Sequence, residues 1–327
     1  MKYGLYLVPT DDYPPITELA RAIEERGFDS IWVPEHSHIP TTGSTPYPGR
    51  GPVTRDFART LDPFVALTAA ATVTTKLQLG TGICLLIQRD MIHTAKTVAT
   101  LDHLSRGRVL FGVGGGWNKP EMENHGTDYA TRFQRLEEQL QALKTIWTED
   151  EAEYHGTHVD FAPMWLWPKP VSKPHPPIFI GGGGRRTLSL AGREANIVGL
   201  APRILKEQRA EPKSLTWAAA EEKVDWVREA AGDRFDDLVF NVYPSGSPIV
   251  VTDDLRGEAR KIIDRLKSRT GIELTEQEVI DSPHVYIGSI DRFVEKFREL
   301  RERLGVSSFL VGDLTELGPV VERLAGT

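Results

Sequence analysis

The strongest constraint on the fold is a repeated alternation between short apolar segments and longer stretches with helical periodicity. Each apolar segment has the length and composition of a buried strand, and apolar residues recur at helical spacing between segments. Eight strands are expected, at residues 3–8, 30–33, 77–86, 109–113, 178–180, 195–200, 238–242 and 307–311. Eight strands, each followed by a helix, predict an α/β fold of the TIM or (β/α)8 barrel type rather than an open sheet.

The length of the chain is compatible with one barrel. Its 327 residues exceed the usual size of a domain, but α/β barrels often reach this length as one unit. Neither a low-complexity linker nor a strong repeat divides the sequence, so we expect a single domain over residues 1–327. Residues 151–176 are rich in Pro, His and Trp and predict a surface hairpin plus loop, whereas residues 271–289 are expected to be irregular.

Composition argues against several classes of function. The net charge is −7 and the aromatic residues are not interleaved with a basic stripe, which disfavours a nucleic-acid surface. Cys84 is the single cysteine, so the chain can form neither an internal disulfide nor a cysteine-based metal site. No apolar run approaches the ~20 residues of a membrane span, and the N-terminus lacks a signal-peptide layout. We therefore expect a cytoplasmic enzyme that does not bind membranes.

A histidine is expected at the mouth of the barrel, where the loops after the strands carry function. Residues 34–38, Pro-Glu-His-Ser-His, follow the second strand and place His36 there. An imidazole titrates near neutrality and can donate or accept a proton. The alternative, a loop histidine without chemistry, has similar weight on placement alone. Glu35, His36 and His38 could converge on a metal only if this loop folded back, so we expect no metal.

Two glycine-rich segments follow the next strands. Gly80 and Gly82 lie within the third strand, where glycine marks either a bulge, a close approach to a ligand, or tight packing. Residues 112–117 invite comparison with the dinucleotide motif G-x-G-x-x-G, but the last position is Trp117 and no helix is expected directly after it. A Rossmann site is therefore excluded. The segment is expected to offer bare backbone that accepts a flat ring system.

The fifth strand leads into four glycines, two arginines and a helix. Residues 181–184 are all glycine, followed by Arg185 and Arg186. Backbone N–H groups at a helix N-terminus bind anions, and two arginines strengthen the attraction for a phosphate. A flexible turn with solvated arginines is the alternative. The phosphate site is the favoured interpretation.

An ordered set of segments resembles the luciferase-like monooxygenases, and specifically their deazaflavin (coenzyme F420)-dependent branch. Any one segment is weak evidence, but the set in this order is specific. The segments are ERGFDSIWVPEH (25–36), LGTGI (79–83), TLDHLSRGR (100–108), GVGGGWN (112–118), IWTED (146–150), WPKP (167–170), PPIFIGG (176–182) and VYIGS (285–289).

The resemblance implies a bacterial-luciferase-like TIM barrel with insertion segments and a flavin or deazaflavin in its mouth. In this family a non-prolyl cis peptide commonly forms a bulge behind the central ring, which here would join Gly82 and Ile83. Phosphate contacts would fall on Gly183 and Gly184. The expected cofactor-binding residues are Gly82, Ile83, Gly115, Gly116, Trp117, Gly182, Gly183, Gly184, Arg185 and Arg186.

The resemblance also implies candidate catalytic residues. His36 occupies the place of a catalytic histidine of the family's sugar-phosphate dehydrogenases, and Glu35 precedes it as an acidic residue does there. Those enzymes have a catalytic glutamate after the glycines of the fourth strand. This chain has Trp117 at that position and Glu121 further on. The departure disfavours sugar-phosphate oxidation and favours a more apolar substrate, with His36, Glu35 and Glu121 as the catalytic candidates.

Together these features predict an oxidoreductase that transfers a hydride between coenzyme F420 and a small organic substrate. One alternative is an FMN-dependent monooxygenase that uses O2 and a partner reductase. A second is a non-catalytic flavin-binding barrel. A phosphate-handling lyase or isomerase would need a lysine or a pair of acids in the mouth, and no well-placed candidate is found. The family resemblance also implies a homodimer.

Overall fold

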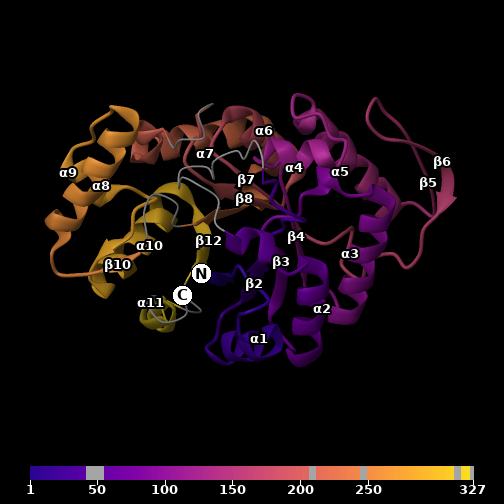
Figure 1. Cartoon of the computed structure of the whole chain (residues 1–327), viewed down its shortest axis with the longest axis horizontal. Coiled ribbons are helices and arrows are strands. Elements are labelled where there is room, and N and C mark those ends of the chain that lie inside the picture. The colour runs from indigo at the N-terminus through magenta and orange to yellow at the C-terminus, as the bar shows by residue number, and fades with distance from the viewer. Residues whose placement is uncertain (42–54, 206–210, 244–248, 313–317, 325–327) are drawn as a thin grey trace.

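The eight segments expected to be strands all form strands, and they close into one parallel barrel (Figure 1). The computed structural model describes residues 1–41, 55–205, 211–243, 249–312 and 318–324. The barrel order is β1-β12-β9-β8-β7-β4-β3-β2. The strands are β1 (Lys2–Tyr6), β2 (Ser30–Val33), β3 (Gln78–Thr81), β4 (Val109–Val113), β7 (Ile178–Gly182), β8 (Ile197–Leu200), β9 (Val239–Val242) and β12 (Val306–Val311).

Helices follow the strands and cover the outside of the barrel, as the sequence predicts. Asp62 illustrates why they begin where they do, because its carboxylate accepts the N–H groups of Phe64 and Val65 in the first turn. The larger helices are α1 (Ile16–Glu25), α2 (Pro63–Val73), α3 (Met91–Ser105), α5 (Arg132–Thr148), α6 (Arg185–Glu194), α7 (Trp217–Ala231), α8 (Leu255–Thr270) and α10 (Ile290–Leu304), and the shorter α11 (Gly318–Leu324) follows β12.

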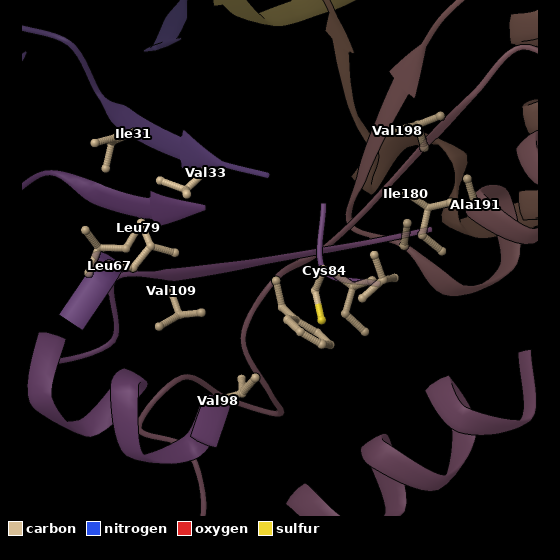
Figure 2. Packing of buried hydrophobic residues seen from close by; sticks show 14 of the residues in the cluster. Ile31, Val33, Leu67, Leu79, Cys84, Val98, Val109, Ile180, Ala191 and Val198 are labelled. Carbon is tan, nitrogen blue, oxygen red and sulfur yellow. The ribbon is translucent and has the colours of Figure 1, made fainter. Parts of the chain in front are cut away.

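The main core lies between the barrel and these helices. Ile31, Leu79 and Val109 project from successive strands toward this layer, and Cys84 lies among the same buried side chains (Figure 2). The thiol of Cys84 is fully buried, and burial raises its pKa well above the usual value. Cys84 is therefore a small core residue.

A second group of side chains fills the inside of the barrel. It comprises the buried residues Trp32, Leu110, Phe179 and Leu310. A Cβ atom on Gly80 would lie 2.4 Å from the indole of Trp32, on the neighbouring strand. Of the alternatives for this in-strand glycine, tight packing is therefore the one that the structure supports.

Several local expectations need correction. The strand expected over residues 77–86 ends at Thr81. Residues 271–289 are not all irregular, because α9 (Glu276–Asp281) forms with a capping box between Thr275 and Glu278, and β11 (Ile287–Gly288) pairs with β10 (Val250–Val251). A six-residue helix with one capping box is too short to show a periodic apolar pattern.

The hairpin expected within residues 151–176 is confirmed. Its strands β5 (Glu151–His155) and β6 (Asp160–Trp165) are antiparallel, and Figure 1 shows them extending outward at the end of the molecule opposite α8 and α9. Within the described part of the chain, none of the helices combines the length and the apolar character that a membrane span requires.

Candidate active site

His36 and Glu121 meet at the carboxyl ends of β2 and β4. His36 lies in the loop after β2, and Glu121 lies in the first turn of α4 (Lys119–Asn124). The distance from His36 Nδ1 to Glu121 Oε2 is 2.8 Å, and the two side chains are 6% and 0% exposed. Because a carboxylate only accepts hydrogen bonds, this contact places a proton on Nδ1 and leaves Nε2 as the nitrogen that can exchange one.

The helix that carries Glu121 corrects one expectation. No helix was expected directly after Trp117, yet α4 begins two residues later, at Lys119. Pro120 in its first turn has the backbone angle that a helix start requires, which explains why a helix forms here without a periodic apolar pattern. The exclusion of a Rossmann site stands because β4 belongs to a closed barrel.

Aromatic rings surround the imidazole of His36. Phe57 and Trp117 each place a ring centroid 5.4 Å from that of His36, with interplanar angles of 81° and 71°. These edge-on contacts keep the ring in apolar surroundings, which strengthens its interaction with Glu121. Trp117 therefore lies beside the predicted proton-transfer group.

Glu35 forms its hydrogen bonds with residues other than His36. Its Oε2 accepts the N–H of Leu85 at 2.6 Å, and its Oε1 accepts from Nε of Arg89. Arg89 also binds Asp62 at 2.7 Å. Among the described residues, the acid that contacts His36 is Glu121, whereas Glu35 ties the loop after β2 to the loop after β3.

The end of β3 has the backbone geometry that the family resemblance predicted. The peptide bond between Gly82 and Ile83 is cis, which confirms the prediction. A Cβ atom on Gly114 would lie 2.4 Å from the side chain of Ile83. The loop after β3 therefore packs closely against the glycines that follow β4.

Protein side chains cover one side of those glycines. A Cβ atom on Gly115 would lie 2.7 Å from the ring of Phe133, and one on Gly116 would lie 2.6 Å from Met122. Gly116 also has a φ of +62°, which side chains disfavour. The expectation of bare backbone is wrong on this side, because these glycines allow α4 and α5 to approach β4.

Asn118 is a residue that the sequence analysis missed. Its side chain is 2% exposed, and neither its amide oxygen nor its amide nitrogen has a hydrogen-bond partner among the described residues. Buried amides are almost always paired, so this one indicates a place for a bound polar group or water. Its place at the end of the segment GVGGGWN (112–118) was the available signal.

The N-terminus of α6 has the features of an anion site. Gly184 is the residue before the helix, and no side chain caps the first turn. A Cβ atom on Gly183 would lie 2.3 Å from the carbonyl oxygen of Pro202, so the chain passes tightly there. At Gly184 the described part of the chain places no atom within 4 Å of the same position, apart from the two neighbouring residues. The N-terminus of α6 is therefore a candidate site for an anion, with room beside Gly184.

Two arginines share one aromatic ring beside this turn. The guanidinium carbons of Arg132 and Arg186 lie 4.4 and 5.1 Å from the centroid of Phe133. Burial and the neighbouring Arg186 lower the pKa of Arg132, and its Nε is buried without a partner among the described residues. An anion here would relieve both effects. The sequence analysis missed Arg132, whereas Arg185 pairs with Glu229 at 2.7 Å.

The predicted residues therefore form two groups. Glu121 and Trp117 both contact His36, and Arg186 joins Arg132 at Phe133, which packs on Gly115. No group of three or more His, Cys, Asp or Glu side chains in the described ranges is arranged to hold a metal ion.

A closed parallel barrel with its polar residues after the strand ends defines the class of (β/α)8-barrel proteins. Within that class, the chain belongs to the luciferase-like monooxygenase family, because the sequence model of that family matches residues 3–308. The family comprises oxidoreductases and monooxygenases, with both coenzyme F420-dependent and FMN-dependent members.

Curated relatives match parts of the chain. An uncharacterized protein of Mycobacterium tuberculosis is 44% identical over 187 residues, which are 56% of this chain and 66% of that protein. An FMNH2-dependent dimethylsulfone monooxygenase of Pseudomonas putida is 40% identical over 102 residues, 30% of this chain and 28% of the enzyme. An F420-dependent glucose-6-phosphate dehydrogenase of Amycolatopsis mediterranei is 27% identical over 202 residues, 59% and 55% respectively.

Solved structures show the same fold. A monooxygenase from Streptomyces bottropensis superposes with a TM-score of 0.71 over 98% of this chain and 97% of that chain. The sequence identity is 19%, so this likeness establishes the luciferase-like barrel and not the reaction.

Proposed function

We propose that this chain is an oxidoreductase that transfers a hydride between coenzyme F420 and a small organic substrate, with His36 moving the accompanying proton. The observation that carries the proposal is the buried contact between His36 and Glu121 at the carboxyl end of the barrel. The chain belongs to a family with F420-dependent members, and it is similar to an F420-dependent glucose-6-phosphate dehydrogenase. Both facts support coenzyme F420 as the cofactor.

The residues at the mouth fit a deazaflavin. Asn118 offers an unpaired buried amide to a polar ring edge, and the N-terminus of α6 with Arg132 and Arg186 offers charge to a phosphate. Gly82 and Ile83 form the cis bond that the family uses behind the ring. When bound, coenzyme F420 supplies a ring carbon that gives or takes a hydride.

The chain's own contribution is proton transfer and exclusion of water. Glu121 fixes the imidazole of His36, so that Nε2 takes the proton of a substrate hydroxyl in oxidation or returns it to a carbonyl oxygen in reduction. Phe57 and Trp117 give this position apolar walls. Those walls favour an uncharged substrate over a sugar phosphate.

An FMN-dependent monooxygenase is the second candidate, favoured by the 40% identity to the FMNH2-dependent enzyme. That reaction would need O2 and a reductase partner. Parallel titrations with coenzyme F420 and FMN, followed by spectra with and without O2, separate the two. Homodimerisation and a cytoplasmic location also belong to the proposal.

Gly184→Val is expected to weaken binding of coenzyme F420 by about tenfold or more, about 1.4 kcal/mol, without destabilising the fold. The Cβ atom of the new side chain would have no atom of the described residues within 4 Å apart from its chain neighbours, and Gly184 has the extended angles φ −109° and ψ 150°. It would instead occupy the space from which a phosphate reaches the first turn of α6. Fluorescence titration measures the affinity, and thermal melting checks the fold.

Gly183→Val is the matched comparison. Its side chain would collide with the carbonyl of Pro202, so we expect a lower melting temperature. If the Gly184→Val variant has the melting temperature and the coenzyme F420 affinity of the wild type, the phosphate does not lie at this helix.

A further inference from the structure

Three consecutive residues after β2 each bind one residue of a single short segment. His36 Nδ1 lies 2.8 Å from Glu121 Oε2. Ser37 Oγ lies 2.7 Å from His125 Nε2. His38 Nε2 lies 2.8 Å from Asn124 Nδ2. These three pairs, which we call the loop–α4 ladder, join the two sides of the mouth.

Helical spacing explains why one segment supplies three partners. The three partners are spaced i, i+3 and i+4, so they share one face of the helix. Glu121 and Asn124 belong to α4, and His125 is the C-cap residue directly after it. The inner pair is buried, whereas Ser37, Asn124 and His125 are exposed. The ladder thus runs from the predicted proton-transfer group to the protein surface.

Ser37 links the inner pair to the outer ones. Its backbone N–H donates to Glu121 Oε1 at 3.1 Å, and its hydroxyl lies 3.5 Å from the same oxygen. The hydroxyl also lies 2.9 Å from His38 Nδ1, in addition to His125. Both oxygens of Glu121 are therefore held by adjacent residues of one loop, one through His36 and the other through Ser37.

Counting protons assigns the direction of these bonds. A hydroxyl has one proton to donate and can accept two hydrogen bonds. The amide nitrogen of Asn124 donates to His38 Nε2, so neutral His38 carries its proton on Nδ1 and donates it to Ser37 Oγ. If His125 donates from Nε2 as well, the hydroxyl proton is available to Glu121 Oε1.

We propose that Ser37 is a positioning residue: with His38 and His125 it holds Glu121 in the orientation that keeps the proton of His36 on Nδ1 and Nε2 free for substrate. This inference rests on the proposed function of His36. None of the three outer residues needs to touch substrate or cofactor. Their effect reaches the reaction through Glu121 and His36.

The test combines imidazole NMR with single-turnover kinetics. Long-range ¹H–¹⁵N spectra of the protein without cofactor, at a pH where the imidazoles are neutral, should show His36 and His38 in the Nδ1–H form. Ser37→Ala should shift His36 toward a mixture of forms, because Glu121 loses the hydroxyl that helps to hold its carboxylate against Nδ1. His38 should stay in the Nδ1–H form, because Asn124 still donates to its Nε2. The hydride-transfer rate from reduced coenzyme F420 to a panel of small ketones and enones should fall about three- to tenfold, the effect of one hydrogen bond.

Two variants separate positioning from general damage. Ser37→Thr keeps the hydroxyl and should restore both the tautomer of His36 and the rate. Ser268→Ala removes an exposed hydroxyl from α8 and should change neither. The inference is overturned if Ser37→Ala leaves the tautomer of His36 unchanged, or if Ser37→Thr is as slow as Ser37→Ala. A wild type with the expected tautomers but no hydride transfer would instead contradict the proposed function.

Discussion

Replacing His36 with alanine is expected to lower the rate of hydride transfer by about 10²–10⁴, the usual contribution of a general acid or base. Affinity for coenzyme F420 should stay nearly unchanged, because the proposed phosphate site at α6 lies on other residues. Hydride transfer to or from a carbon is usually accompanied by a proton transfer on the substrate, and we propose that Nε2 of His36, the ring nitrogen that Glu121 does not bind, carries this proton. Rapid mixing of the loaded enzyme with the panel of ketones and enones measures the step.

His93→Ala is the matched control, since His93 is an exposed histidine at the start of α3, with a side chain 91% exposed. Its rate should equal that of the wild type. A His36→Ala rate within a few-fold of wild type between about pH 5 and 9 would remove His36 from the mechanism.

The second large effect concerns stability. Lys296 lies in α10 with 4% of its surface exposed, and its Nζ donates to the carbonyl oxygens of Ile280, Ser282 and Val285 at 2.9, 2.8 and 2.6 Å. Burial lowers the pKa of Lys296, but three acceptors favour the ammonium form, which has three protons to give. These bonds connect the last turn of α9 and the segment after it to α10.

Lys296→Met is expected to lower the free energy of unfolding by about 2–4 kcal/mol, because three buried carbonyl groups each lose a hydrogen bond from the lysine amine. Arg292 still donates to Ile280, and the N–H of Val285 still donates to Ser282. Urea denaturation followed by circular dichroism measures the loss. Lys261→Met, at an exposed lysine of α8 paired with Glu258, should cost less than about 1 kcal/mol. A loss for Lys296→Met no larger than that of the control would show that water replaces the amine.

The barrel could be predicted from the sequence because each of its strands is an apolar run between longer helical patterns. The position of His36 at the mouth followed from its place after β2. Its contact with Glu121 was harder to foresee, because the two residues lie 85 positions apart and meet only through α4. That helix has six residues and a proline in its first turn, so no periodic pattern announces it.

Glycine motifs gave the least complete prediction. A glycine shows that a side chain is absent, but the sequence does not show which atoms use the space. At Gly115 and Gly116 the space holds Phe133 and Met122, which come from other elements. Arg132 was not predicted for a related reason. It is the first residue of α5, and only the folded chain brings Arg186 to Phe133, the ring that Arg132 also contacts.

The central claim is that this barrel binds a deazaflavin and transfers a hydride with the help of His36. The most direct measurement is the absorbance of coenzyme F420 after anaerobic mixing of its reduced form, the wild-type protein and the panel of small ketones and enones. We predict that at least one panel member reoxidises the bound coenzyme in a single turnover, and that His36→Ala slows this step at equal occupancy. Tight binding of FMN without binding of coenzyme F420, or oxidation that requires O2, would contradict the claim.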